Sequence, residues 1–136
     1  MAGYAELLGL RAASPMRAAE AIEAGLGFPS FERFRRHVEL SAEGLAALVR
    51  IPPRTLARRR AAGRLEAEES DRLVRLARVF AAALALFEGD EAATRHWMGT
   101  PLAALKRKTP LQTATTDPGA REVEALIGRL EHGIAI

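Results

Sequence analysis

Six arginines lie within 15 residues of one another in the middle of the chain, at positions 50, 54, 58, 59, 60 and 64. Guanidinium groups bind phosphate through charge-assisted hydrogen bonds, and they can also read guanine through two parallel hydrogen bonds. Thr55 adds a hydroxyl group that could contact a base or a phosphate. This chemistry predicts a DNA-binding set that consists of Arg50, Arg54, Thr55, Arg58 and Arg59.

Clustered arginines can also be an ordinary solvent-exposed face that binds nothing. Such clusters are common in proteins rich in alanine and arginine. The distribution of charge bears on this alternative. The whole chain carries a net charge of +3, but residues 30–64 carry +6, whereas residues 65–99 carry −3. Because charge distribution matters more than the total for the choice of partner, the concentration of positive charge favours the DNA-binding interpretation.

Residue patterns for catalysis or metal binding are scarce. The sequence has no cysteine, which excludes disulfides, thiolate metal sites and thiol nucleophiles. His37, His96 and His132 have no acidic or histidine neighbour at metal-ligand spacing. A glycine-rich phosphate loop and a serine nucleophile motif are also missing from the sequence. We therefore expect neither an enzyme nor a bound metal or cofactor.

The composition predicts a helical protein. Hydrophobic residues make up 49% of the chain and aromatic residues only 5%, so alanine and leucine must fill the interior, which favours helices over sheets. The most apolar stretch, Val79–Phe87, is far shorter than the roughly 20 residues of a membrane-spanning helix, and no signal sequence opens the chain. We expect a cytoplasmic protein of one compact domain, or of two small helical domains that share a core.

Two short helices must position the arginines. Ser41 is a good N-cap for a helix that runs to about Val49, and Pro53 suits the first turn of a second helix, which Gly63 ends. Two helices of this length, joined by a tight turn, resemble a helix-turn-helix over residues 41–63. In that motif the second helix meets base edges in the major groove.

Capping residues and prolines mark the other helices. They predict helices over about 15–24 (behind Ser14), 31–38 (behind Ser30) and 90–98 (behind Asp90), and helix starts at Thr100-Pro101, Thr109-Pro110 and Asp117-Pro118, the last helix ending at Gly133. Residues 4–10 could form another short helix or a disordered leader. The predicted fold is all-α, with an N-terminal helical region over 1–64 and a central helix followed by a small C-terminal domain over 65–136.

The central helix is predicted over about 66–88. Its apolar residues at 73, 76, 80, 84 and 87 are spaced by three and four, so one stripe faces a core. Further apolar residues at 74, 79, 82 and 86 cover much of the opposite side. We therefore expect this helix to be buried on two faces, either as a central strut or as a dimer seam.

Two apolar features near the C-terminus have open interpretations. Trp97 is the only tryptophan, and it could fill the core or contact a partner. Ile134, Ala135 and Ile136 follow the helix stop at Gly133. Chain ends usually fray, but an apolar tail can also insert into a cleft of a partner, where aliphatic side chains act as anchors.

Several segments in a fixed order resemble the Xre/MbcA/ParS-type antitoxins, whose C-terminal region binds toxins that carry a RES domain. The resemblance covers residues 25–136 approximately. It rests on Leu45–Val49 with Ile51–Leu56, Glu69–Ala77, Ala92–Trp97, Thr109–Leu111, and Thr116–Val123 with Leu130–Gly133. The chain departs from the family pattern at Lys106-Arg107, where many relatives have paired glycines before the Thr-Pro step.

The resemblance implies an all-α antitoxin that forms a homodimer, binds a cognate RES-domain toxin and blocks the NAD-binding pocket of that toxin. It also implies repression of its own operon through an Xre-like helix-turn-helix bound to operator DNA, with residues 65–136 containing the toxin-binding domain. In similar antitoxins the C-terminal end lies at or near the active site of the toxin. The implied toxin-binding set is Trp97, Leu130, Glu131, His132, Gly133, Ile134, Ala135 and Ile136.

The main alternative function is a free-standing helix-turn-helix transcription regulator whose C-terminal helices only dimerise it. Such a protein would need no toxin. Gene order discriminates between the two, since a neighbouring reading frame of RES-domain size favours the antitoxin and an isolated gene favours the regulator.

Overall fold

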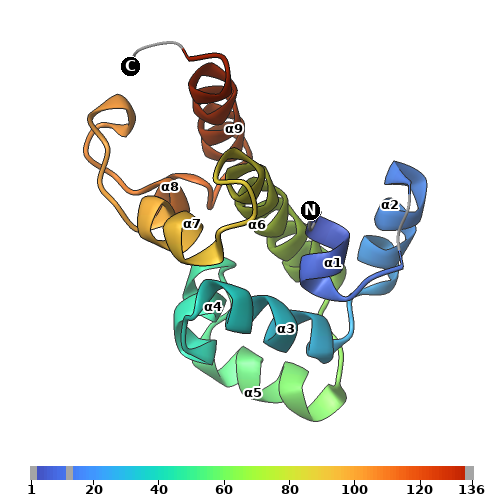
Figure 1. Ribbon diagram of the computed structural model, residues 1–136. Coiled ribbons are helices and arrows are strands. Elements are labelled where there is room, and N and C mark those ends of the chain that lie inside the picture. Colours follow the sequence, from blue (N-terminus) through green and yellow to red (C-terminus); the bar gives the residue numbers. More distant parts are fainter. Residues whose placement is uncertain (1–2, 12–13, 134–136) are drawn as a thin grey trace.

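The computed structural model describes residues 3–11 and 14–133, and the regular elements of these residues are helices (Figure 1). The elements are α1 (Tyr4–Leu8), α2 (Pro15–Ala24), α3 (Phe28–Val38), α4 (Ala42–Leu48), α5 (Pro53–Ala62), α6 (Ala67–Leu86), α7 (Glu91–Met98), the 3-10 helix η1 (Ala103–Leu105), α8 (Pro110–Thr113) and α9 (Asp117–Glu131). Within the described residues, β-structure is limited to two isolated bridges. The predicted all-α fold is therefore confirmed.

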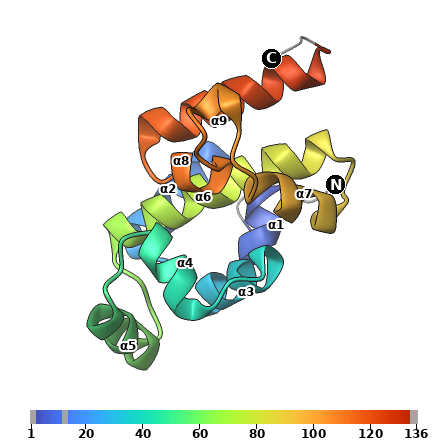
Figure 2. The ribbon, with the colours of Figure 1, turned by 90° about the vertical axis from the view of Figure 1, so that its left-hand side faces the viewer.

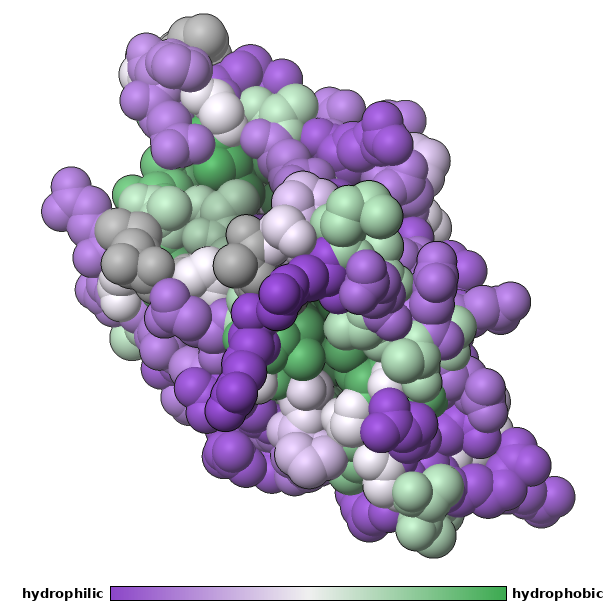
Figure 3. Space-filling model, turned by 90° about the vertical axis from the view of Figure 1, so that its right-hand side faces the viewer, coloured by the Kyte–Doolittle hydropathy of each residue, from purple (hydrophilic) through white to green (hydrophobic). Residues whose placement is uncertain are grey.

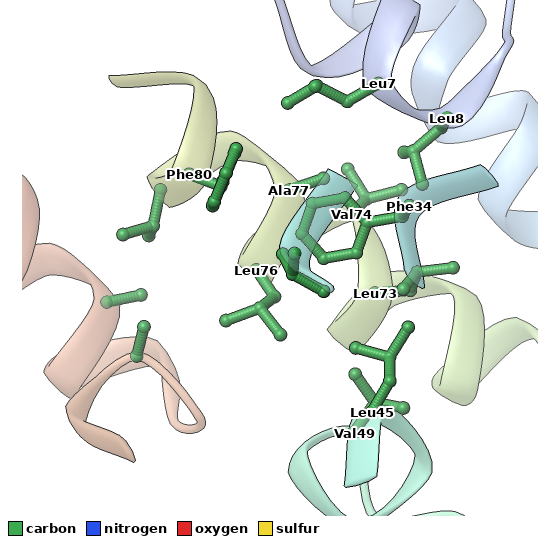
Figure 4. Packing of buried hydrophobic residues seen from close by; sticks show 14 of the residues in the cluster. Leu7, Leu8, Phe34, Leu45, Val49, Leu73, Val74, Leu76, Ala77 and Phe80 are labelled. Carbon is green, nitrogen blue, oxygen red and sulfur yellow. The ribbon is translucent and has the colours of Figure 1, made fainter. Parts of the chain in front are cut away.

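The longest helix, α6, forms the centre of the molecule. It contacts α1 and α2 as well as α7 and α9. Figure 4 shows side chains of α6 meeting Leu7 and Leu8 of α1, Phe34 of α3 and residues at the end of α4. The Phe34 and Phe80 rings lie edge to face with their centroids 5.8 Å apart. Burial of α6 on two faces, with a central role, is thus confirmed.

Most helix starts follow the local capping chemistry predicted from the sequence. The side chains of Ser14, Ser41 and Asp90 each accept a hydrogen bond from the backbone N–H three residues further on. Thr109 and Gln112 form a reciprocal capping box at the start of α8. These bonds satisfy backbone donors that have no partner inside the helix.

Three predicted helix starts were wrong. Helix α3 begins at Phe28 rather than behind Ser30, because Pro29 fits its first turn and Ser30 is buried. Thr100-Pro101 begins no helix, since the Thr100 hydroxyl donates to the His96 carbonyl and closes α7. Helix α9 is capped by Thr116, not Asp117, through a 3.1 Å bond from the Gly119 N–H.

An ion-pair network joins α3 to α7. His37 Nδ1 lies 2.9 Å from a Glu91 carboxylate oxygen. Arg95 donates to the His37 carbonyl at 3.1 Å and pairs with Glu39 at 2.9 Å. Sequence spacing gave no sign of this pair, because Glu91 is distant from His37 in the sequence and reaches it only through the tertiary fold. The network ties the helices that precede α6 to those that follow it.

The remaining surface is uneven. Helix α5 and the C-terminal end of α9 lie at opposite ends of the molecule, with α6 between them (Figures 1 and 2). The face drawn in Figure 3 carries recessed apolar areas that hydrophilic side chains surround. Within residues 3–11 and 14–133, no helix is long and apolar enough to cross a membrane.

Candidate DNA-binding and partner-binding surfaces

Helix α5, the second helix of the predicted helix-turn-helix, is largely exposed. Leu56 is its only buried side chain. The helix packs against α4 and projects from one end of the molecule (Figure 2). A single buried residue fixes a helix weakly, so the position of α5 must depend on other contacts.

The strongest of these contacts is an ion pair with α6. Arg59 Nε donates to a carboxylate oxygen of Glu69 at 2.8 Å, and Arg59 also lies 3.8 Å from Glu66. Glu69 is buried, and the same oxygen accepts from the Glu66 N–H at 2.9 Å, which completes the capping box of α6. Burial alone raises the pKa of Glu69, but the bonds from Arg59 and from the Glu66 backbone lower it below its ordinary value. The carboxylate therefore remains charged and anchors α5.

Further contacts hold the C-terminal end of α5. The Arg60 guanidinium lies over the Phe28 ring, 5.4 Å from its centroid. The Phe28 N–H donates to the Gly63 carbonyl, and the Leu65 N–H donates to the Leu26 carbonyl, both at 2.8 Å. Because these bonds tie the end of α5 to the start of α3, they fix the helix in orientation.

The predicted DNA-binding residues divide into two groups. Arg50, Arg54 and Arg58 are exposed, and no carboxylate within the described part of the chain pairs with them. Thr55 is half-buried and accepts a 3.2 Å bond from Arg58. Arg59, in contrast, points toward α6 and is engaged by Glu69. Four of the five residues thus face outward from the α4–α5 unit, and Arg59 positions the helix.

A second surface feature lies at the opposite end, where α7, η1 and α9 meet. It is an apolar hollow of about 190 Å³. Its walls are Trp97, Leu102, Ala103, Ala104, Leu126 and Leu130. Trp97 is half-buried and packs on Phe87 at a centroid distance of 6.1 Å, so it contributes both to packing and to the exposed wall.

The structure brings Trp97 and Leu130 of the predicted toxin-binding set together in this hollow. Glu131, His132 and Gly133 are exposed at the end of α9, close in sequence to the hollow but not part of its lining. Ile134, Ala135 and Ile136 lie outside the described residues. Sequence reasoning missed the other walls of the hollow, although the four-residue spacing of Leu126 and Leu130 places both on one face of α9.

Comparison with known families divides the chain at α6. The family described as antitoxin Xre-like helix-turn-helix domain matches residues 17–78, and the family described as antitoxin Xre/MbcA/ParS C-terminal toxin-binding domain matches residues 82–133. The chain belongs to the Xre/MbcA/ParS antitoxin family. The first match contains the α4–α5 unit, and the second contains every residue that lines the hollow.

Individual members of this antitoxin family are similar to the chain over part of their length. Antitoxin Xre of Yersinia enterocolitica is 48% identical over 85 residues, which are 62% of this chain and 57% of that protein. Antitoxin Xre of Photorhabdus laumondii is 43% identical over 72 residues, or 53% of this chain and 49% of that protein. Antitoxin Xre of Pseudomonas putida is 34% identical over 87 residues, which are 63% of this chain and 54% of that protein. The matches therefore span about half the length of these relatives, which are named as antitoxins and not as enzymes.

Proposed function

We propose that the chain is the antitoxin of a toxin–antitoxin pair and that it neutralises its toxin by binding, without chemistry of its own. The observation that carries this proposal is the exposed apolar hollow of Trp97 and Leu130, which falls inside the region similar to toxin-binding domains. Apolar pockets with aromatic walls are the usual anchor points of protein interfaces. The names of the relatives agree with the same role.

The finer description follows the family resemblance. We propose a RES-domain toxin as the partner, occlusion of its NAD-binding pocket as the means of inhibition, and a homodimer as the active form. The toxin-contacting set is Trp97, Leu130, Glu131, His132, Gly133, Ile134, Ala135 and Ile136. Removal of residues 133–136 should weaken neutralisation if the tail reaches the active site of the toxin.

A second role in DNA binding has its own support. The α4–α5 unit lies inside the region similar to Xre-like helix-turn-helix domains, and it presents Arg50, Arg54, Thr55 and Arg58 outward. We propose that these residues bind the operator of the chain's own operon and repress it. Arg59 supports this binding indirectly, because it holds α5 against Glu69.

The test is growth of cells that express the neighbouring reading frame, with and without this chain. Cellular NAD is followed at the same time, and the two proteins are purified together. We expect the neighbouring product alone to stop growth and to deplete NAD, and we expect co-expression of this chain to restore growth through a stable complex.

The outcomes test the antitoxin function and the proposed NAD-degrading activity of the toxin separately. Toxicity without loss of NAD would contradict an NAD-degrading toxin but leave the antitoxin in place. Absence of both toxicity and complex would overturn the antitoxin function and favour a free-standing regulator.

A further inference from the structure

Three consecutive cations form the tip of the loop between α7 and α8. Lys106, Arg107 and Lys108 are all exposed, and residues 99–116 contain no other charged side chain. Within residues 3–11 and 14–133, no carboxylate lies in ion-pair distance of any of the three. We refer to these three residues as the cationic tip. Its charge is not neutralised by neighbouring residues of the fold and is available to a partner.

The backbone holds the cationic tip in a fixed shape. The Arg107 N–H donates to the Leu102 carbonyl at 2.9 Å, and the Leu102 N–H donates to the Lys108 carbonyl at 3.1 Å. Leu105 is buried beneath the loop. Because the loop is closed by these bonds, the three side chains extend from a rigid base, and a partner would lose little backbone entropy in ordering it.

Two positions of the tip are conformationally strained. Lys106 has a φ of 56° and Arg107 a φ of 66°. Glycine adopts such angles without steric conflict, whereas residues with a Cβ atom do not. Strain of this kind persists where the surrounding structure holds the backbone in place. Here the backbone bonds of the closed loop hold it, and the charged side chains at these positions pair with no carboxylate of the described fold.

The cationic tip borders the apolar hollow. Leu102, Ala103 and Ala104 line the hollow and lead directly into the tip. The volume of about 190 Å³ is below the roughly 300–1,000 Å³ of small-molecule sites. It suits one or two apolar side chains of a protein. A surface that offers an apolar anchor beside carboxylates would match both features at once.

A nucleic acid fits these observations less well. The loop that carries the tip and the exposed helix α5 lie at opposite ends of the molecule in both ribbon views (Figures 1 and 2). A phosphate backbone also has no apolar group to fill the hollow beside the tip. The geometry therefore favours a protein partner.

We propose that the cationic tip selects the toxin by charge, through acidic residues that surround an apolar side chain seated in the hollow. This inference rests on the proposed antitoxin function and specifies the surface chemistry of the toxin. Charges at the rim of an interface act mainly on the association rate and on its salt dependence. The tip thus steers the toxin toward the hollow and discriminates against toxins without the acidic surround.

The experiment measures the association rate of the purified product of the neighbouring reading frame with immobilised full-length chain, at low and at high ionic strength. The test variant is Lys106→Glu with Arg107→Glu and Lys108→Glu. A second variant, Lys106→Gly with Arg107→Gly, removes two charges in the backbone conformation that glycine prefers. The matched control reverses three exposed arginines elsewhere, Arg11, Arg17 and Arg36, and changes the net charge of the chain equally.

We expect the charge reversal to slow association at least about tenfold at low ionic strength, and the difference to close at high salt. The glycine variant should show a smaller loss in the same direction, with an unchanged helical circular dichroism spectrum. The control should remain close to the parent chain.

Three results would overturn the inference. Equal rates for the tip reversal and the control would show that only net charge matters. A loss of operator binding with unchanged toxin binding would make the tip a DNA contact. If the parent chain itself forms no complex, the antitoxin function fails first and the inference fails with it.

Discussion

At the scale of single residues, Glu69 does more than place a negative charge at the start of a helix, because it also holds α5 against α6. Its buried carboxylate accepts from Arg59 and from the Glu66 backbone. Glu69→Gln keeps the shape but removes the charge. Because hydrogen bonds to charged groups contribute about 1.5–3 kcal/mol, we expect the free energy of unfolding to fall by about 2 kcal/mol at neutral pH. Urea unfolding measures this, with the exposed Glu68→Gln as the control.

The pH dependence of the same comparison follows from the lowered pKa of Glu69, in which the bonds from Arg59 and the Glu66 backbone outweigh burial. A carboxylate whose folded pKa is depressed contributes stability that is complete above its unfolded pKa of about 4.3. That contribution is lost as the pH falls through the folded pKa. The difference in stability between the parent chain and Glu69→Gln should therefore shrink in acid, and a constant difference would contradict the charge argument.

Glu69→Gln is expected to lower the free energy of unfolding, whereas replacing the strained residues of the cationic tip by glycine is not. Lys106→Gly and Arg107→Gly should each leave the free energy of unfolding unchanged or raise it by about 0.5 kcal/mol. Relief of a left-handed conformation gains about 1–2 kcal/mol, and the greater freedom of glycine in the unfolded chain offsets part of this. Lys108→Gly is the control, since Lys108 is not among the residues with positive φ, and it should destabilise the fold. Thermal unfolding compares the three.

At the scale of elements, α5 is an exposed helix, and the DNA-binding role proposed for its outward arginines can be tested through salt dependence. We expect Arg54→Ala and Arg58→Ala each to reduce by about one the slope of log affinity against log salt concentration for DNA from the chain's own promoter. Each replacement removes one phosphate contact, so affinity should also fall at low salt. Arg17→Ala, on α2, provides the control. Slopes that stay at the parent value would show that the α4–α5 unit binds no DNA through these arginines.

The helix boundaries show how far local sequence signals reach. Thr100-Pro101 and Thr109-Pro110 present the same dipeptide, yet only the second begins a helix. Gln112 follows Thr109 at the position that closes a capping box, whereas Ala103 occupies that position after Thr100 and has no side-chain acceptor. The capping box thus distinguishes these two Thr-Pro steps, although α2, α4 and α7 begin at capping residues without one.

The contacts that define the sites were harder to predict than the helices. The arginine cluster of α5 was visible from spacing alone, but the engagement of Arg59 by Glu69 depends on how α5 meets α6. The pairing of His37 with Glu91 likewise joins residues from separate helices. Periodicity and capping describe a chain within one element, so contacts between elements, including the walls of the hollow, follow only from the tertiary fold.

At the scale of the whole molecule, the two candidate surfaces lie at opposite ends of α6, and each falls within its own family match (Figure 1). Helix α6 runs between the two ends, and the contacts of Arg95 join α7 to the end of α3. In the proposed function, one chain holds DNA at one end and a protein at the other. Changes confined to one surface should then leave the other unaffected, because mutations that share no contact are usually additive.

Ala104→Glu tests this independence, because Ala104 is an exposed wall of the hollow. A carboxylate there would fill the pocket and repel the acidic surround of the proposed partner, so we expect affinity for the toxin to fall by about 2 kcal/mol or more. Affinity for promoter DNA should not change. Ala92→Glu, exposed on α7 and outside the hollow, is the matched control. If Ala104→Glu weakened both activities equally, with the fold intact by circular dichroism, the two ends would be coupled, and the toxin-binding end would take part in holding DNA.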